Sequence, residues 1–148
     1  MSRHSAPAPD YEFRHRIPVQ IRFNDIDMFG HVNNTAYLQY FDLGKASYFA
    51  MLTGGRLDKM SIGLVIVNIS CDFYAQTFMH EKIEVLTAVH TISQRSLVLE
   101  QRVVSASDGE VKSVCRTVMA AFDPAAGTGA EISDDWRRMI SEFEERVF

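Results

Sequence analysis

The segment from residue 34 to residue 52 places the strongest restriction on the fold. It reads NTAYLQYFDLGKASYFAML, contains no proline and is followed by Thr-Gly-Gly, which is typical of a helix and its exit. Such a helix would be about 28 Å long at a rise of about 1.5 Å per residue. Its polar residues Gln39, Asp42 and Lys45 form one narrow stripe, and apolar and aromatic residues cover most of the remaining circumference. A helix with so much apolar surface must be wrapped by other structure.

Most of the chain outside this helix is predicted to form strands. Alternating apolar and polar residues predict five of them, at residues 13–23, 61–75, 82–92, 96–106 and 110–122. The last two are joined through Ser107-Asp108-Gly109, and Asp-Gly between alternating segments is typical of a tight hairpin turn. We therefore expect an α+β fold in which a five-stranded, largely antiparallel sheet curls around one long central helix. The sheet's other face carries apolar residues, so we expect a second copy of the chain to cover it.

The length of the chain and the character of its ends predict the domain organisation. A chain of 148 residues is most simply one domain, which we assign to residues 13–148. Residues 1–12 contain two prolines and no periodicity, so we expect a flexible lead-in. Near the C-terminus, Ser133 is a plausible cap, and the spacing of Trp136, Ile140 and Phe143 predicts a short amphipathic helical tail.

The overall charge and hydropathy pattern exclude several kinds of partner. A formal net charge of -4 argues against binding to nucleic acid, which requires a clustered excess of Lys and Arg. No stretch approaches the roughly 18 apolar residues of a membrane span, and the first residues lack the apolar core of a signal peptide. We therefore expect a cytoplasmic protein with no membrane partner.

The cysteines and histidines favour neither a disulfide framework nor a metal site. Cys71 and Cys115 both lie in apolar, strand-like runs, where a thiol usually behaves as a small buried hydrophobic group. His80 and His90 lie in or beside separate predicted strands, with no carboxylate or thiol at ligand spacing. We expect no bound metal.

Polar residues are concentrated just before the long helix, in DIDMFGHVNN at residues 25–34. A helix N-terminus has backbone N–H groups without partners and a partial positive charge, so it can stabilise an oxygen that becomes negative during a reaction. Gly30 permits a tight turn there. Asn33 or Asn34 can cap the helix while leaving a neighbouring amide free.

The two aspartates of this junction have two interpretations. Either Asp25 or Asp27 could simply cap or neutralise the positive helix end. Alternatively, one of them could be a base or nucleophile opposite the free amide, an arrangement suited to attack on an acyl carbonyl. His31 could be a base, a metal ligand or, most simply, a loop-packing residue. No Gly-x-Ser-x-Gly motif points to a serine hydrolase.

The stretch RFNDIDMFGHVNNTAYLQYFDLGKASYF resembles the signature of the hotdog-fold acyl-CoA thioesterases of the 4-hydroxybenzoyl-CoA thioesterase class. The agreement runs from Asp-x-Asp through Gly-His-Val-Asn-Asn to Tyr37 and the Phe41-Asp42 pair. The resemblance implies a hotdog fold, with a five-stranded antiparallel sheet around a long helix, assembled as homodimers or homotetramers. It also implies hydrolysis of an acyl-CoA to a free carboxylic acid and CoA, with the CoA thioester as substrate and no cofactor.

The same resemblance assigns roles to individual residues. It makes Asp27 the catalytic carboxylate, acting as nucleophile or as base for water, and the Asn34 backbone amide the donor that polarises the thioester carbonyl. It makes Tyr37 a substrate-binding residue. The supporting residues it implies are Asp25, Gly30, His31 and Asn33. The substrate-binding residues it implies on the partner subunit's strand are Val67, Asn68 and Ile69.

Two alternatives to a hydrolase remain on the sequence alone. The turn AQTFMHEK, residues 75–82, lacks the proline and Gly-Asp that family members often carry, and that turn can contact CoA. The chain could therefore be a non-catalytic acyl-CoA-binding hotdog module. A hotdog hydratase is less favoured, because those enzymes resemble Asp-x-Asn-Pro-x-His, whereas Asn-Pro is absent here and Asp27 and His31 are four residues apart.

Overall fold

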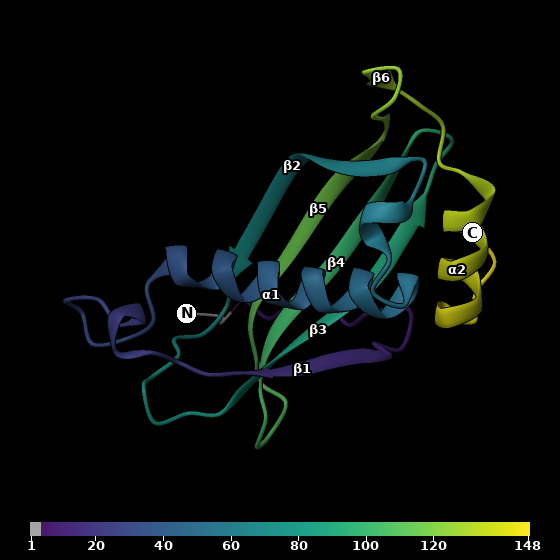
Figure 1. Ribbon diagram of the computed structural model, residues 1–148. Coiled ribbons are helices and arrows are strands. Elements are labelled where there is room, and N and C mark those ends of the chain that lie inside the picture. Colours follow the sequence, from purple (N-terminus) through teal and green to yellow (C-terminus); the bar gives the residue numbers. More distant parts are fainter. Residues whose placement is uncertain (1–3) are drawn as a thin grey trace.

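The computed structural model describes residues 4–148, and its main feature is one antiparallel sheet packed against a long helix (Figure 1). The helices are α1 (Asn34–Thr53) and α2 (Asp134–Glu144), with short 3-10 turns η1 (Phe23–Asp25) and η2 (Leu57–Lys59). The strands are β1 (His15–Val19), β2 (Gly63–Phe73), β3 (Ile83–Ile92), β4 (Ser96–Ser105), β5 (Val111–Asp123) and β6 (Thr128–Gly129). The predicted α+β architecture, a curled sheet around one long helix, is confirmed.

The strands follow the order β1-β3-β4-β5-β2, and every pair is antiparallel. The five predicted strands are all present, although β1 is shorter than its predicted range because the chain leaves the sheet after Val19 and turns into η1. The sheet has a sixth strand that the pattern did not predict, because β6 contains only 2 residues. It pairs with the end of β5. β2 lies at one edge of the sheet, with β5 as its only neighbouring strand among the described residues.

Helix α1 crosses the inner face of the sheet at very short range. A Cβ atom placed on Gly44 would lie 2.6 Å from Cγ1 of Val85 on β3, so only glycine allows this approach. Beside it, the Gln101 side-chain amide donates a hydrogen bond of 2.8 Å to the backbone carbonyl of Phe41. This polar contact fixes the position of the helix along the sheet.

The far side of α1 differs from the prediction of a fully wrapped helix. Lys45, predicted to belong to the polar stripe, is buried, and its ammonium lies 3.4 Å from Asp42. Gln39 and Asp42 of the stripe are exposed, but apolar residues are exposed as well: Leu38 is 41%, Leu43 56% and Met51 40% exposed. One copy of the sheet therefore covers only one side of the helix.

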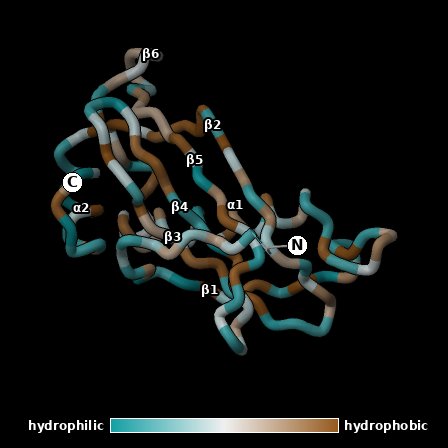
Figure 2. The backbone as a smooth tube through the Cα atoms, turned by 180° about the vertical axis from the view of Figure 1, so that it is seen from behind, coloured by the Kyte–Doolittle hydropathy of each residue, from teal (hydrophilic) through white to brown (hydrophobic). Residues whose placement is uncertain are grey.

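The outer face of the sheet is partly covered by the chain's own N-terminal segment. The Tyr11 hydroxyl lies 3.1 Å from Nδ1 of His90, and the Arg102 guanidinium donates to the carbonyl of Pro7. Glu100 and Arg102 form a buried ion pair beneath this segment. Figure 2 views the molecule from behind and so shows this outer face, with β3 and β4 crossing it. The flexibility expected of residues 1–12 stays a prediction, and residues 1–3 lie outside the described part.

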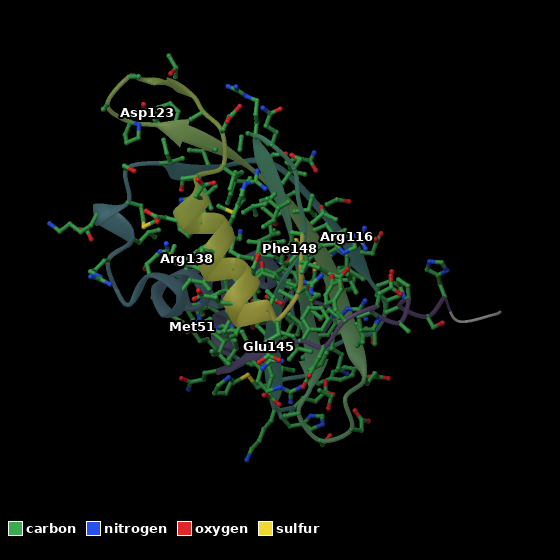
Figure 3. All side chains as sticks on the ribbon, turned by 90° about the vertical axis from the view of Figure 1, so that its right-hand side faces the viewer. Met51, Arg116, Asp123, Arg138, Glu145 and Phe148 are labelled. Carbon is green, nitrogen blue, oxygen red and sulfur yellow. The ribbon has the colours of Figure 1, made fainter. Side chains whose placement is uncertain are left out.

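Helix α2 closes the end of the sheet, where the sequence predicted a helical tail (Figure 3). Ser133 caps it by accepting a hydrogen bond from the Trp136 backbone amide. The Trp136 indole is fully buried and donates to the carbonyl of Ile62, 2.7 Å away. The Tyr48 hydroxyl of α1 donates to the buried Glu144 carboxylate at 2.8 Å, which ties the two helices together.

Both cysteines are free thiols, as predicted. Cys71 and Cys115 are direct partners across β2 and β5, with their sulfur atoms 2.9 Å apart. Cys115 is buried and Cys71 half-buried.

Candidate active site

The polar junction before α1 is a small closed loop. Ile26 and Val32 form an isolated antiparallel bridge, and inside it the Asp27 amide donates to the carbonyl of His31 at 3.1 Å. The Gly30 amide then donates to the carbonyl of Asp27 at 3.0 Å. This turn requires φ of 85° at Gly30, in the left-handed region that favours glycine. The loop therefore holds residues 27 and 31 beside each other.

The Asp27 carboxylate stays near the surface of this loop. Its Oδ1 atom accepts a hydrogen bond of 2.9 Å from the backbone amide of Phe29, and the residue is half-buried. It does not cap α1, because that role belongs to Asn33, whose side chain accepts from the Thr35 amide at 3.1 Å. One interpretation of Asp27, that it merely caps the helix, is therefore excluded.

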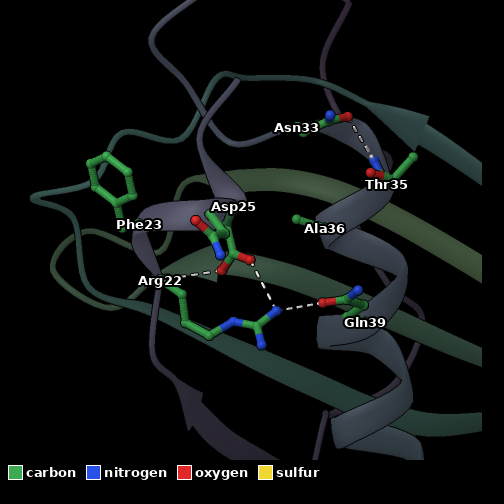
Figure 4. A pocket seen from close by; sticks show the side chains of 8 residues that line it. Arg22, Phe23, Asp25, Asn33, Thr35, Ala36 and Gln39 are labelled. Atoms are coloured by element: carbon green, nitrogen blue, oxygen red, sulfur yellow. Dashed lines mark hydrogen bonds and ion pairs between the residues drawn. The ribbon is translucent and has the colours of Figure 1, made fainter. Parts of the chain in front are cut away.

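Asp25 has a very different environment, shown in Figure 4. It is buried, and its carboxylate accepts hydrogen bonds from the Tyr40 hydroxyl at 2.7 Å and from the backbone amide of Arg22 at 2.8 Å. The Arg22 guanidinium adds a contact of 3.1 Å. Burial by itself raises the pKa of Asp25, but these three donors outweigh it and hold the pKa below its ordinary value. Asp25 is therefore an ionised anchor that attaches the loop to α1.

Asp25 and Arg22 also border a hollow of about 480 Å³ between η1 and the first turns of α1. In it, the Arg22 guanidinium lies between the Asp25 carboxylate and the Gln39 side-chain oxygen, 2.6 Å from the latter. Phe23 points away and is 84% exposed. Asp27 does not line this hollow. Because the polar groups of Arg22, Asp25 and Gln39 are already bonded to one another, we assign this hollow a structural role.

A second concave region lies at the very start of α1. Two adjoining hollows, of about 220 and 350 Å³, share Asn34 and Phe73, and we call them together the α1 groove. Its lining includes His31, Asn34, Tyr37, Leu38, Ile69, Cys71, Phe73 and Gln76. Among the described residues, no group accepts a hydrogen bond from the Asn34 backbone amide. A free donor at the positive end of a 20-residue helix thus borders the groove.

Comparison with known proteins then identifies the family. The model of the thioesterase-like superfamily matches residues 21–140, which includes the loop, α1 and the whole main sheet after β1. The chain belongs to this superfamily. The hotdog thioesterase resemblance of the sequence is thereby confirmed at the level of superfamily and fold.

Members and structural neighbours of the superfamily differ in how much of the chain they match. The protein YsmA of Bacillus subtilis, itself uncharacterized, is 31% identical over 81 residues, which are 55% of this chain and 54% of that protein. The match therefore spans about half the length of this relative. A thioesterase from Thermus thermophilus, solved with coenzyme A and Zn, superposes with a TM-score of 0.81 and 25% identity over 92% of this chain and 98% of the other. A 1,4-dihydroxy-2-naphthoyl-CoA thioesterase from Synechocystis has a TM-score of 0.74 and 16% identity, over 86% and 96% of the two chains, and shows the fold alone.

Within this superfamily member, several of the predicted site residues lie together. Asn34, His31 and Ile69 line the α1 groove, and Asp27 is bonded to His31 across the loop. The His31 ring is close to parallel with the ring of Phe29, and its Nδ1 lies 3.5 Å from the carbonyl of Val32. These contacts fit the interpretation of His31 as a loop-packing residue.

Other predicted site residues are placed less directly. Tyr37 borders the α1 groove but is only 2% exposed, and its hydroxyl is bonded to Thr77. Val67 and Asn68 are exposed on β2. The substrate-binding roles of all three stay predictions. The sequence did not predict a role for Thr77. The departure of the turn at residues 75–82 from the family's usual pattern was the only feature that pointed to this region.

Residues 4–148 contain no group of three or more His, Cys, Asp or Glu side chains that could hold a metal ion. No helix in that range has the length and apolarity needed to cross a membrane. The cytoplasmic location stays a prediction.

Proposed function

We propose that the protein is an acyl-CoA thioesterase that hydrolyses an acyl-CoA thioester to a free carboxylic acid and CoA. The observation that carries this proposal is the free Asn34 amide at the edge of the α1 groove, with the Asp27 carboxylate on the adjoining loop. Membership of the thioesterase-like superfamily supports the same reaction. The coenzyme A in the Thermus thermophilus thioesterase supports a CoA thioester as the substrate.

In the proposed mechanism, the thioester carbonyl oxygen accepts a hydrogen bond from the Asn34 amide. This donor and the helix dipole stabilise the negative charge that develops on the oxygen during attack. The backbone amide of Phe29 donates a hydrogen bond to one oxygen of the Asp27 carboxylate, and this contact orients the other oxygen. That oxygen either removes a proton from water, which adds to the carbonyl carbon, or adds itself and forms an anhydride that water then cleaves. In both routes the C–S bond breaks, and the CoA thiolate leaves and takes up a proton. No metal or other cofactor is required.

We further propose that a second copy of the chain completes the groove, as a homodimer or homotetramer. Edge strand β2 carries apolar side chains with 44% to 59% exposure, namely Val65, Ile66, Val67, Ile69 and Phe73. Leu38 of α1 is also exposed and borders the same hollow as Ile69 and Phe73. An exposed apolar edge strand is a surface that proteins usually cover, which favours a second copy here. Sedimentation should report two or four chains. A charge on the edge strand, as in Val67→Lys, should reduce the assembly to monomers and lower turnover.

The proposed activity is tested with a panel of short, long and aryl acyl-CoAs and a thiol-trapping reagent. Thioester hydrolysis releases one CoA thiol per turnover. Asp27→Asn should lower kcat by about 10² to 10⁴, the usual range for losing a positioned base, while the exposed Asp58→Asn serves as the matched control. Parental turnover by Asp27→Asn would remove the assignment.

A non-catalytic acyl-CoA-binding module is the main competing outcome of this test. It predicts saturable binding, for example by calorimetry, with no thiol released from any member of the panel. That result would replace hydrolysis by binding as the function of the α1 groove.

A further inference from the structure

One buried residue of the turn between β2 and β3 contacts the chain on both sides of Asn34. Thr77 has no exposed surface. Its backbone carbonyl accepts a hydrogen bond of 2.8 Å from the amide of Val32, and its hydroxyl lies 2.7 Å from the hydroxyl of Tyr37. Val32 precedes Asn34 by two residues in the loop, and Tyr37 follows it by three in the first turn of α1. Thr77 is thus bonded to the chain both before and after the free amide.

These two contacts of Thr77 matter for catalysis because an amide that polarises a carbonyl must be accurately placed. Groups that stabilise a transition state need to be held within about 0.5 Å of their working position. The Asn33 cap and the helix fix the amide of Asn34 relative to α1. Among the described residues, Thr77 is the one that hydrogen-bonds to both the loop and the helix, and it follows directly on the 73–76 segment that forms the opposite wall of the α1 groove.

The turn that carries Thr77 is itself rigidly held. The buried Lys112 ammonium donates to the carbonyl of Gln76 at 3.0 Å and to the carboxylates of Glu81 at 2.9 Å and Glu110 at 2.7 Å. Burial alone would lower the pKa of Lys112, but the two carboxylates raise it above its ordinary value, so the ammonium stays charged. The ion-paired turn can therefore act as a fixed support.

We infer that Thr77 is a positioning residue of the proposed thioesterase site, holding the Asn34 amide in place through Val32 and Tyr37. The inference rests on the proposed function. It also gives a role to the buried Tyr37 hydroxyl, which is bonded to Thr77. Thr77 itself does not line the groove and is not a catalytic residue.

The test is a double-mutant cycle on the full chain with the best acyl-CoA of the panel. Thr77→Val keeps the shape and the backbone carbonyl but removes the hydroxyl, and Tyr37→Phe removes the hydroxyl's partner. Loss of a polarising donor costs about 10² to 10³ in kcat, so a displaced donor should cost about 10-fold, with KM changed less than about 2-fold. The double variant should be no worse than either single variant, because both remove one interaction. Thr77→Ser, which restores the hydroxyl, should recover the parental kcat.

A matched control separates positioning from general stability. Thr53, at the other end of α1, also has a buried hydroxyl, which donates to the carbonyl of Phe49 at 2.8 Å. Thr53→Val should lower the melting temperature about as much as Thr77→Val and leave kcat unchanged. Amide hydrogen exchange in residues 31–37 should rise in Thr77→Val and Tyr37→Phe, but not in Thr53→Val.

The possible failures are distinct. If the unsubstituted protein releases no thiol from any acyl-CoA, the proposed function is wrong. If it is active but Thr77→Val retains its kcat, or changes only KM, or if the effects of the two substitutions multiply in the double variant, the inference about Thr77 is wrong and the proposed function stands.

Discussion

Replacing the two aspartates of the loop by asparagine, one at a time, should separate stability from turnover. Asp25 is buried with three donors on its carboxylate, whereas Asp27 is half-buried with one. The two residues are only two positions apart and have identical side chains. Any difference between the variants therefore measures their surroundings.

The loss expected for Asp25→Asn follows from those contacts. A hydrogen bond to a charged group contributes about 1.5–3 kcal/mol, and asparagine keeps only one of the two acceptor oxygens. Its amide N–H₂ group would face a donor, either the Tyr40 hydroxyl or Arg22. The Arg22 ion pair adds little, because the Arg22 side chain is 60% exposed. We expect a loss of about 3 kcal/mol, which lowers the melting temperature by about 6–12 °C in a chain of this size.

Asp27→Asn should behave in the opposite way. The asparagine oxygen can still accept the hydrogen bond from the Phe29 amide, so the turn is preserved. The melting temperature should stay within about 2 °C of the parent, since a near-surface substitution that keeps its hydrogen bond usually changes stability by less than about 0.5 kcal/mol. The loss of kcat should be the factor of about 10² to 10⁴ expected for a missing base.

Thermal unfolding by circular dichroism and turnover at a temperature where both variants are folded provide the two measurements. Tyr40→Phe is the matched control, because it removes one donor from the charged Asp25 carboxylate and should cost about 1.5–3 kcal/mol. The reasoning is refuted by the reverse pattern, in which Asp25→Asn is as stable as the parent and inactive while Asp27→Asn unfolds early and turns over normally.

Two further predictions concern the fold. Gly44→Ala should lower the unfolding free energy in urea by about 2 kcal/mol, because the clash with Val85 and the disturbed Gln101 hydrogen bonds outweigh the helix propensity gain of about 1 kcal/mol. The control Ala46→Gly, at an exposed position of α1, measures the propensity difference alone. A Gly44→Ala variant as stable as the parent would contradict the close approach of α1 to the sheet. Burial lowers the pKa of His15 below its ordinary 6.5. As the pH falls below 6.5, the unfolded chain therefore binds a proton that the folded chain does not, and the unfolding free energy decreases. His15→Gln should weaken this dependence between pH 7.5 and pH 5.

Much of the fold could be predicted because its signals are local in the chain. Helix α1 was predicted at 34–52 and ends at Thr53, and the long strands after it begin and end within two residues of their predicted ranges. Helical and strand periodicities depend only on neighbours a few positions away. The same argument explains the missed β6, which is too short to carry any periodicity.

The site could be predicted only in part. The residues of the junction and the positive helix end were readable, since capping residues and glycine turns also have local signatures. The residue pattern alone left the roles of Asp25 and Asp27 open, and only the family resemblance divided them. The buried, hydrogen-bonded environment of Asp25 was not readable, because it depends on Tyr40, 15 positions along the chain. Lys45 was assigned to the same polar stripe as Asp42, yet Lys45 is buried and Asp42 is exposed, because burial depends on tertiary packing and not on spacing along the helix.

By itself, the sequence determined that a polar loop enters a long apolar helix wrapped by an antiparallel sheet, and that this arrangement resembles a thioesterase. Only the tertiary structure decided that no group in residues 4–148 accepts a hydrogen bond from the Asn34 amide, that Asp25 is a buried anchor, and that Thr77 is bonded to Tyr37, 40 residues away in the chain. The reason is physical. Periodicity and capping are properties of neighbouring residues, whereas burial and hydrogen-bond partners depend on residues that come together only when the chain has folded.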